Sequence, residues 1–315
     1  MAEYKGIHGT KVQDYTTDPD NPLTGQVWYN ETANTLKYFY NNPGAWATGG
    51  VLNTARRLLA GAGTQTAALA FGGGPPFTAI TESYNGTNWT EVNDLNTARR
   101  QLAGAGTNTA ALGFGGYNPT LPVSPIANTE SWNGTNWTEV NDLNTARSRL
   151  AGAGIQTAAL AFGGDPSTAV TVTWNGTNWT EVNDLNTARR ELAGAGTNTA
   201  ALAFGASPSL ALTESWNGTN WTEVNDLNTG RGALGGVGVD NTSALAFGGE
   251  GPAVTGATES WNGTNWTEVA DLGTARYALA GAGIQTAALA FGGQPSGTLT
   301  EEWNSGPATV TITTD

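Results

Sequence analysis

The hydrophobic and polar positions of this chain follow one pattern that recurs along most of its length. Short segments rich in Ala and Leu alternate with turns of Gly, Asn and Thr, and each copy of the pattern opens with an arginine. These arginines are Arg56, Arg99, Arg147, Arg189, Arg231 and Arg276, so the period is 42 to 48 residues. A fixed period of this size predicts an array of supersecondary units.

Each unit divides at its turns into four predicted strands. In the first copy they are Arg56–Gly63, Thr66–Phe71, Thr78–Tyr84 and Trp89–Val92. The first two could be read as Ala-rich helix, but their Gly spacing, brevity and Thr content favour strands. The Asn-Gly-Thr-Asn sequence before the fourth strand predicts a hairpin turn, because Asn and Gly tolerate positive φ. Four short strands per unit are typical of a propeller blade.

The residue sizes also order the strands from the axis outward. The segment after each arginine is almost entirely Ala and Gly, which suits the crowded innermost strand. The aromatic residues that end the third strand and begin the fourth are then expected to fill the widening space between blades.

The two ends of the chain are expected to share the last blade. Trp46 lies ten residues before Arg56, as Trp89 lies ten before Arg99, so the N-terminal segment imitates a fourth strand. The C-terminus supplies a third strand at 298–303 and a further run at 309–313. We predict an all-β propeller of six four-stranded blades, closed by N- and C-terminal strands, which removes exposed sheet edges. Seven blades, with the hairpin at 36–48 counted separately, is the alternative. The predicted domains are an N-terminal β-hairpin module, 1–43, and the propeller, 44–315.

The repeat resembles a known family. A Gly-Gly doublet such as Gly72-Gly73, an aromatic, a tryptophan and then the next arginine form the kelch pattern, over roughly residues 44–303. The fourth copy departs from it with Gly205-Ala206. The resemblance implies the fold but leaves the function open, because kelch propellers include binding scaffolds, structural proteins and an oxidase branch.

The N-terminal segment resembles a short module of bacteriophage structural proteins. The matching residues are Gly25, Trp28-Tyr29-Asn30, Leu36-Lys37-Tyr38 and Trp46. The resemblance implies a virion protein that this module attaches to the particle. The alternative is that Trp28 and Tyr29 cap the propeller.

Length variation between the copies falls almost entirely between the second and third strands. The gap from the Phe that ends the second strand to the next aromatic ranges from 12 to 18 residues, while the other gaps are nearly constant. Rigid scaffolds carry function on such loops, and neutral drift at an unconstrained turn is the alternative. The candidate binding residues on these loops are Phe77, Tyr117, Asn118, Pro119, Asp165, Ser207, Glu250 and Gln294.

All ten arginines lie where the first strand of a unit begins, which in a four-stranded meander is the end that also carries the variable loops. The blade-opening arginines are expected to be structural, paired with carboxylates of the Glu91 or Asp94 type that precede the next arginine. The second arginines vary between copies, so Arg57, Arg100 and Arg190 join the candidate binding residues. An anion- or glycan-facing mouth is the functional alternative for the whole set.

Composition excludes several kinds of chemistry. A net charge of −13 repels phosphate backbones, so no nucleic-acid partner is expected. The chain has no cysteine and one histidine, His8, so the copper site of the kelch-like oxidase branch cannot be built. No Ser/His/Asp set or phosphate-binding Gly-Lys-Ser/Thr motif occurs in the repeats, and near-identical copies do not supply the two unlike carboxylates of a glycosidase. We expect no enzyme activity, no metal and no cofactor.

The chain begins without an apolar signal-peptide core and has no apolar run of about 18 residues, so neither Sec export nor membrane insertion is expected. We therefore expect a virion or extracellular location, reached by lysis or within a particle. The expected function is that of a non-enzymatic binding or structural protein, with other virion proteins or a host surface protein or glycan as partners. Homo-oligomerisation stays open. The alternative is a secreted carbohydrate-binding or glycan-hydrolysing propeller.

Overall fold

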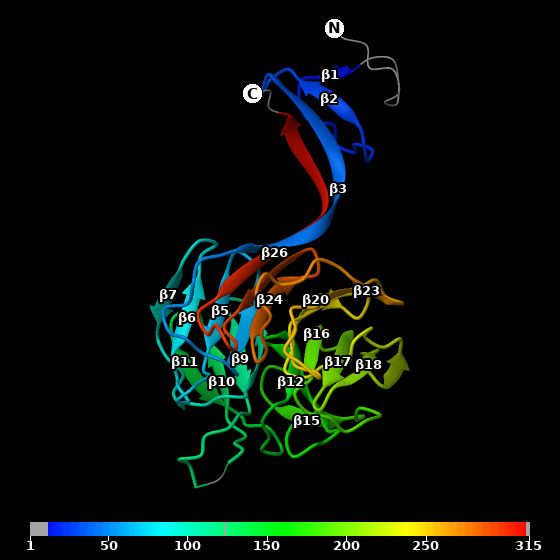
Figure 1. The fold of residues 1–315 in the computed structure, drawn as a ribbon. Helices are drawn as coiled ribbons and strands as arrows, with labels where there is room; N and C mark the ends of the chain where they lie inside the picture. The colour runs from blue at the N-terminus through cyan, green and yellow to red at the C-terminus, as the bar shows by residue number, and fades with distance from the viewer. Residues whose placement is uncertain (1–11, 123, 313–315) are drawn as a thin grey trace. The chain divides into compact units, whose positions relative to one another are not determined.

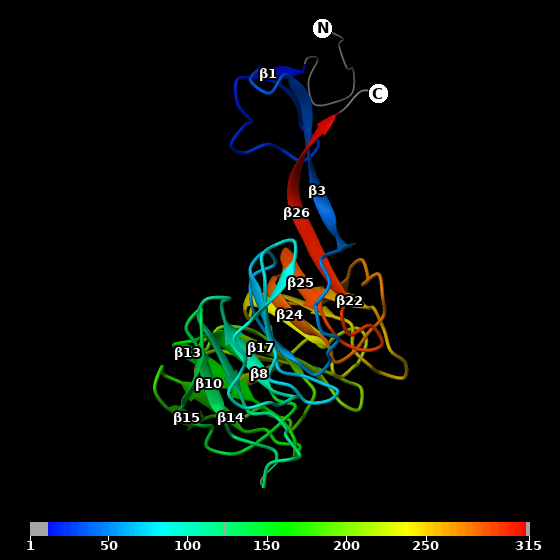
Figure 2. The same ribbon diagram turned by 90° about the vertical axis from the view of Figure 1, so that its left-hand side faces the viewer.

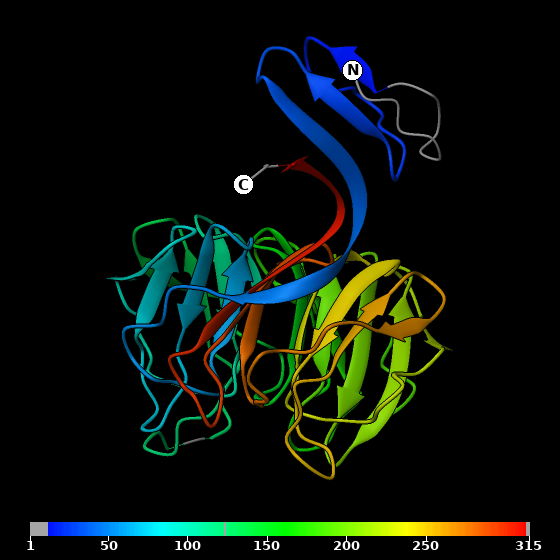
Figure 3. The ribbon, with the colours of Figure 1, turned by 45° about the horizontal axis from the view of Figure 1, so that its top comes forward.

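The computed structural model describes residues 12–122 and 124–312, which form 26 strands and no helix (Figure 1). Accordingly, no helix in this part of the chain is long and apolar enough to cross a membrane. The chain divides into two compact units, residues 1–44 with 304–315, and residues 45–303. The second unit is a six-bladed β-propeller whose blades follow one another in chain order (Figures 2 and 3).

Five blades are continuous four-stranded meanders, each paired in chain order from the inner to the outer strand. Blade I contains β4 (Ala60–Gly63), β5 (Ala68–Phe71), β6 (Thr81–Tyr84) and β7 (Trp89–Val92). Blade II contains β8 (Ala103–Gly106), β9 (Ala111–Phe114), β10 (Thr129–Trp132) and β11 (Trp137–Val140). Blade III contains β12 (Ala151–Ile155), β13 (Ala158–Phe162), β14 (Thr171–Trp174) and β15 (Trp179–Val182). Blade IV contains β16 (Ala193–Gly196), β17 (Ala201–Ala206), β18 (Leu210–Trp216) and β19 (Trp221–Val224). Blade V contains β20 (Gly235–Asp240), β21 (Ser243–Phe247), β22 (Thr258–Trp261) and β23 (Trp266–Glu268).

Blade VI joins the two ends of the chain, which confirms the predicted closure. Its inner strands, β24 (Ala280–Ile284) and β25 (Ala287–Phe291), are followed by β26 (Thr300–Ile312), and β3 (Thr35–Thr48) is the fourth strand of the blade. Because β3 is one continuous strand of 14 residues, the predicted hairpin at 36–48 is wrong, and the described residues form no seventh blade. The two C-terminal runs likewise form a single strand through Ile312; Thr313 lies outside the described residues.

The innermost strands pack around the axis in a closed ring, in the order β4, β8, β12, β16, β20 and β24. Their small residues are required there. A Cβ added at Gly61 would lie 2.6 Å from the carbonyl oxygen of Gly281 on the neighbouring inner strand and 2.6 Å from the Phe291 ring. The Ala–Gly alternation therefore has the steric cause that the sequence indicated.

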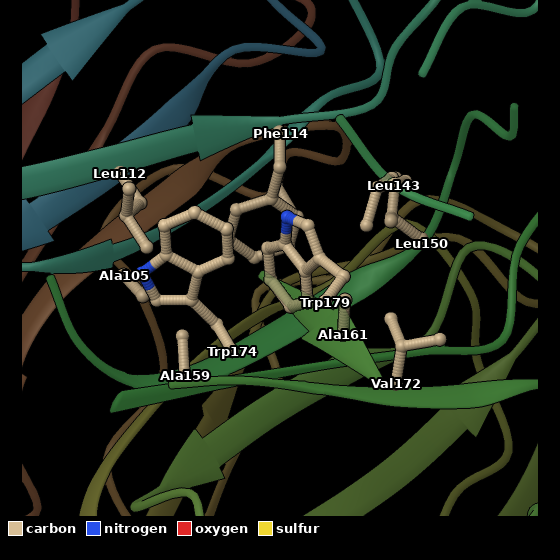
Figure 4. Packing of buried hydrophobic residues seen from close by; sticks show 11 residues of the cluster. Ala105, Leu112, Phe114, Leu143, Leu150, Ala159, Ala161, Val172, Trp174 and Trp179 are labelled. Atoms are coloured by element: carbon tan, nitrogen blue, oxygen red, sulfur yellow. The ribbon is translucent and has the colours of Figure 1, made fainter. Parts of the chain in front are cut away.

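Aromatic side chains fill the space between blades, as predicted. In Figure 4, Trp179 of blade III lies against Trp174 of its own blade and Phe114 of blade II, with ring centroids 5.3 and 5.0 Å away. Its Nε1 donates a hydrogen bond of 3.1 Å to Oγ1 of Thr129, also in blade II. The same contact between blades joins Trp89 to Phe291, Trp137 to Phe71, Trp221 to Phe162, Trp266 to Phe204 and Trp46 to Phe247.

The Asn-Gly-Thr-Asn turns also link neighbouring blades. Asn93 of blade I donates from Nδ2 to Oδ1 of Asn136 at 2.8 Å and to the carbonyl oxygen of Thr135 at 3.0 Å. The equivalent donors in the next three blades are Asn141, Asn183 and Asn225. The near-identity of these turns therefore has a structural cause. Their contrast with the variable loops is then no evidence of a binding face, which must be argued from the side chains that lie on that face.

The first compact unit contains β1 (Gln13–Tyr15) and β2 (Val27–Asn30), the N-terminal part of β3, and residues 304–312 of β26. Its residues converge on the Asp18 carboxylate, which accepts hydrogen bonds from Trp28 Nε1 at 3.0 Å, Asn30 Nδ2 at 2.7 Å and Lys37 Nζ at 2.7 Å. The hydrogen bond from Lys37, followed by that from Asn30, lowers the pKa of Asp18 to about 2. Trp28, Asn30 and Lys37 thus stabilise this unit internally.

Candidate functional site

The blade-opening arginines are buried structural cations. Arg189 is 1% exposed and donates to Oε1 of Glu214 at 3.0 Å, to the carbonyl oxygen of Leu212 at 2.7 Å and to that of Ala203 at 3.3 Å. Oε2 of Glu214 accepts from the backbone N–H of Asn186 at 2.7 Å and from its Nδ2 at 2.9 Å. Four further ion pairs repeat this arrangement: Arg56–Glu82, Arg99–Glu130, Arg231–Glu259 and Arg276–Glu301.

The carboxylate partner is therefore a glutamate on the third strand, and the predicted partners of the Glu91 and Asp94 type are wrong. Asp94 instead accepts a hydrogen bond of 3.0 Å from the backbone N–H of Thr81, and Glu91 is exposed on the outer strand. The predicted structural role is correct, but the partner lies on a different strand.

Blade III lacks this carboxylate, because Val172 occupies the position of the glutamate. Arg147 is still only 2% exposed, and it donates to the carbonyl oxygens of Val170 at 2.5 Å, Gly163 at 3.3 Å and Ala161 at 3.3 Å. Burial lowers the pKa of Arg147 to about 10. This blade holds a buried cation without a direct ion pair.

The residue after each blade-opening arginine lies beside the first residue of a variable loop. Arg57 and Gly74 exchange two backbone hydrogen bonds, of 2.8 and 2.9 Å. Equivalent bridges join Arg100 to Tyr117, Ser148 to Asp165, Gly232 to Glu250 and Tyr277 to Gln294, and Ser207 donates to the carbonyl oxygen of Arg190. These paired residues and the loops define one face of the propeller, which we call the loop face.

The predicted loop residues differ in their access to solvent. Pro119 and Glu250 are exposed, whereas Phe77, Tyr117, Asp165, Ser207 and Gln294 are half-buried. Asn118 is only 5% exposed; its Nδ2 donates to the carbonyl oxygen of Ala98 at 2.7 Å, and its Oδ1 accepts from the N–H of Thr120 at 2.9 Å. Asn118 therefore holds the longest loop in place, and the other residues contribute to the surface of the loop face.

The three second arginines have different surroundings. Arg190 forms an ion pair with Asp165, with 2.5 Å between Nη1 and Oδ1. The guanidinium of Arg100 lies over the ring of Tyr117, 5.6 Å from its centroid. Arg57 has neither partner; its Nη1 lies 3.5 Å from the hydroxyl of Tyr277, and its side chain lines a cavity of about 320 Å³.

A second feature of the loop face was missed by the sequence analysis. One residue per blade has a left-handed backbone, with φ between 50° and 59°: Leu58, Gln101, Arg149, Glu191, Ala233 and Ala278. Each N–H donates to the carbonyl oxygen of the equivalent residue in the preceding blade, at 2.7 to 2.9 Å, so six hydrogen bonds close a ring. None of these residues is glycine, and the sequence therefore carries no signal of positive φ here.

The side chains of this ring surround a cavity of about 100 Å³ on the axis. Nη1 of Arg149 lies 3.2 Å from Oε1 of Glu191, and the amide oxygen of Gln101, turned toward Arg149, accepts from its Nε at 2.7 Å. Leu58, Ala233 and Ala278 line the rest of the ring. The ring of side chains around this cavity is therefore polar on one side, at Gln101, Arg149 and Glu191, and apolar on the other.

We expect Ala233→Gly to raise the free energy of unfolding by about 0.5 kcal/mol, because glycine removes the steric cost of positive φ and this gain exceeds its extra unfolded-state entropy. The matched control is Ala195→Gly on the extended inner strand β16, which should lower it by about 1 kcal/mol. Urea unfolding measures both variants, and equal losses in the two would contradict the strain at Ala233.

The loop face carries several kinds of polar side chain. Among the described residues, no group of three or more His, Cys, Asp or Glu side chains is arranged to hold a metal ion. His8 lies outside the described residues. The face presents guanidinium groups, carboxylates, amides and proline rings around small cavities.

No family model matches the chain, and no curated protein matches it. Among solved structures, the chain is similar to the one described as "Structure of YjhT", with a TM-score of 0.65 and 12% sequence identity. The similarity covers 85% of this chain and 98% of that one. At this identity the likeness shows the β-propeller fold alone.

Proposed function

We propose that this protein is a non-enzymatic binding protein, a bacteriophage virion component whose loop face recognises a partner on the particle or on a host surface. One observation carries the proposal: a nearly symmetric propeller presents an asymmetric face. Six positions that are equivalent by symmetry hold the pairs Arg57/Gly74, Arg100/Tyr117, Ser148/Asp165, Arg190/Ser207, Gly232/Glu250 and Tyr277/Gln294. Specific recognition needs such unlike groups on a rigid scaffold.

Two resemblances support the finer part of this proposal. The Gly-Gly doublets suit a kelch repeat, since Gly72 and Gly73 both take positive φ, 66° and 103°. The N-terminal sequence around Trp28 and Lys37 resembles modules of phage structural proteins, and on that basis we assign attachment to the first compact unit. Mass spectrometry of purified particles tests the assignment, and absence of the protein from virions would refute it.

A secreted carbohydrate-binding or glycan-hydrolysing propeller is the second candidate, favoured by the cavity of about 320 Å³ beside Arg57. A glycan array and a hydrolysis screen on the isolated protein separate the two candidates. Turnover of any glycan would contradict the proposal that the protein is not an enzyme.

The long loop 117–125 offers a direct test of the loop face. Exchanging it for the short loop 165–167 should leave folding nearly intact, because loop length costs little entropy, and should sharply weaken binding to the glycan or particle component that these experiments identify. The control is a matching length change in the 133–136 turn, which should damage folding because that turn sets the hairpin register and receives the hydrogen bonds of Asn93. Thermal unfolding and binding are measured on both variants. Unchanged binding after the loop exchange would mean that the loops vary by drift.

A further inference from the structure

At two junctions between blades, the residue after the blade-opening arginine lies near the first loop residue of the preceding blade. Between blades III and IV these residues are Asp165 and Arg190, which form an ion pair of 2.5 Å. Between blades VI and I the equivalent residues are Gln294 and Arg57. Here the neutral amide of Gln294 takes the position of the Asp165 carboxylate at the other junction. In the described part of the chain, the arginine is therefore paired with a carboxylate at one junction and has none at the other.

Arg57 is charged but has no carboxylate partner among the described residues, so it can bind an anion. In the part of the chain that the structure describes, no carboxylate lies within ion-pair distance of its guanidinium, whereas Arg149 and Arg190 each have one. Its Nε is buried and has no hydrogen-bond partner. Nη1 of Arg57 donates a long hydrogen bond of 3.5 Å to the neighbouring Tyr277 hydroxyl, which in turn donates to Oε1 of Gln294 at 3.1 Å. A planar guanidinium with free N–H groups is suited to a carboxylate.

The space beside Arg57 is large enough for a ligand. The cavity of about 320 Å³ is lined by Arg57, Gly74, Pro75, Gln294 and Pro295, together with Ala55, Arg56, Gly293 and Gly297. A volume of about 300 Å³ is at the lower end for small-molecule sites. The lining combines Arg57, the buried and already paired Arg56, one amide and proline rings, which favours a compact ligand that has one charged and one less polar side.

We propose that this cavity binds a carboxylate-bearing group about the size of one monosaccharide, with the carboxylate beside Arg57 in the place that Asp165 takes beside Arg190. The group could be an acidic sugar or an acidic amino-acid side chain, since both present the same carboxylate. This inference rests on the proposed function in taking the loop face as a binding surface. It is tested on the isolated protein, so its failure is distinguishable from absence of the protein from virions.

Titration calorimetry with glucuronate, glutarate and glucose tests the ligand class. Glucuronate should bind at millimolar concentrations and glucose should not, and binding should weaken at molar salt, where the Debye length falls to about 3 Å. Glutarate binding as tightly as glucuronate would assign the source to acidic side chains, and weaker glutarate binding would assign it to acidic sugars. Equal binding of glucose and glucuronate, or no binding of either acid, would overturn the proposal.

Three variants test the site itself. Gln294→Asp supplies an internal carboxylate beside Arg57 and should weaken binding of the acid that binds best by at least about tenfold, as should Arg57→Met, because each removes the charge-assisted contact. Arg149→Met is the matched control and should leave binding unchanged, since Arg149 is paired with Glu191 and does not line this cavity. Circular dichroism checks that all three variants fold. Unchanged binding in Gln294→Asp, or an equal loss in Arg149→Met, would contradict the assignment to this cavity.

Discussion

Trp179→Ala should lower the free energy of unfolding by about 3–5 kcal/mol, as removal of a large core aromatic does. The side chain is 5% exposed, packs between Trp174 and Phe114, and donates to Thr129 Oγ1. The variant would therefore leave a cavity at the interface of blades II and III and an unpaired hydroxyl inside it. Trp137→Ala, at the interface of blades I and II, should behave in the same way.

Urea unfolding followed by circular dichroism measures the loss. Trp179→Phe is the control for the hydrogen bond, because it keeps much of the ring packing and should cost less than the alanine variant. Thr180→Ala, at an exposed neighbouring position of β15, should change stability by less than about 0.5 kcal/mol. A loss below about 1 kcal/mol in Trp179→Ala would contradict the burial of these rings and make them candidate stacking surfaces for sugars.

Glu214→Val should lower the free energy of unfolding by about 3 kcal/mol, because it leaves the buried Arg189 cation without its counter-ion. It also removes the acceptor of two of the three Asn186 hydrogen bonds and leaves the one to the carbonyl oxygen of Trp221. The variant reproduces in blade IV the arrangement that blade III has naturally with Arg147 and Val172. Because Arg147 remains buried against three carbonyl oxygens, we expect Glu214→Val to fold.

The reciprocal variant tests the same physics in the opposite direction. Val172→Glu should raise the free energy of unfolding by about 1–3 kcal/mol, since it supplies a counter-ion for Arg147 and an acceptor for Asn144, as Glu214 does for Arg189 and Asn186. Both variants are measured by urea unfolding in the same buffer. A loss of stability in Val172→Glu would contradict the view that blade III carries an uncompensated charge.

Local features of the sequence determined the architecture of the propeller. The six blade-opening arginines favoured six blades over seven, and the continuous strand β3 decided between them. The Ala and Gly after each arginine identified the inner strand, because only small side chains fit where six strands converge. The constant five-residue interval from Trp132 to Trp137 reflects a direct cross-strand pair joined by a tight turn. Each of these constraints acts within one repeat, so it can be read from a short stretch of chain.

The sequence predicted the candidate site only in part. It placed Arg57, Arg100, Arg190 and the loops together, because strand alternation fixes which turns share a face. It did not distinguish Arg190, which Asp165 neutralises, from Arg57, which has no carboxylate beside it. It also did not reveal the anchoring role of Asn118, whose acceptor on Ala98 lies 20 residues away.

Only the tertiary structure shows which residues from distant parts of the chain contact one another. These contacts depend on how neighbouring blades pack and on the path of the backbone. The Arg189–Glu214 pair spans 25 residues, and the composition of a repeat contains several carboxylates that could have filled that role. The left-handed ring through Arg149 and Glu191 is maintained by hydrogen bonds from one blade to the next, against the local preference of its residues. Arg57 and Tyr277, 220 residues apart, become neighbours because the ring closes. Such contacts are selected by packing and burial over the whole molecule, and no local pattern encodes them.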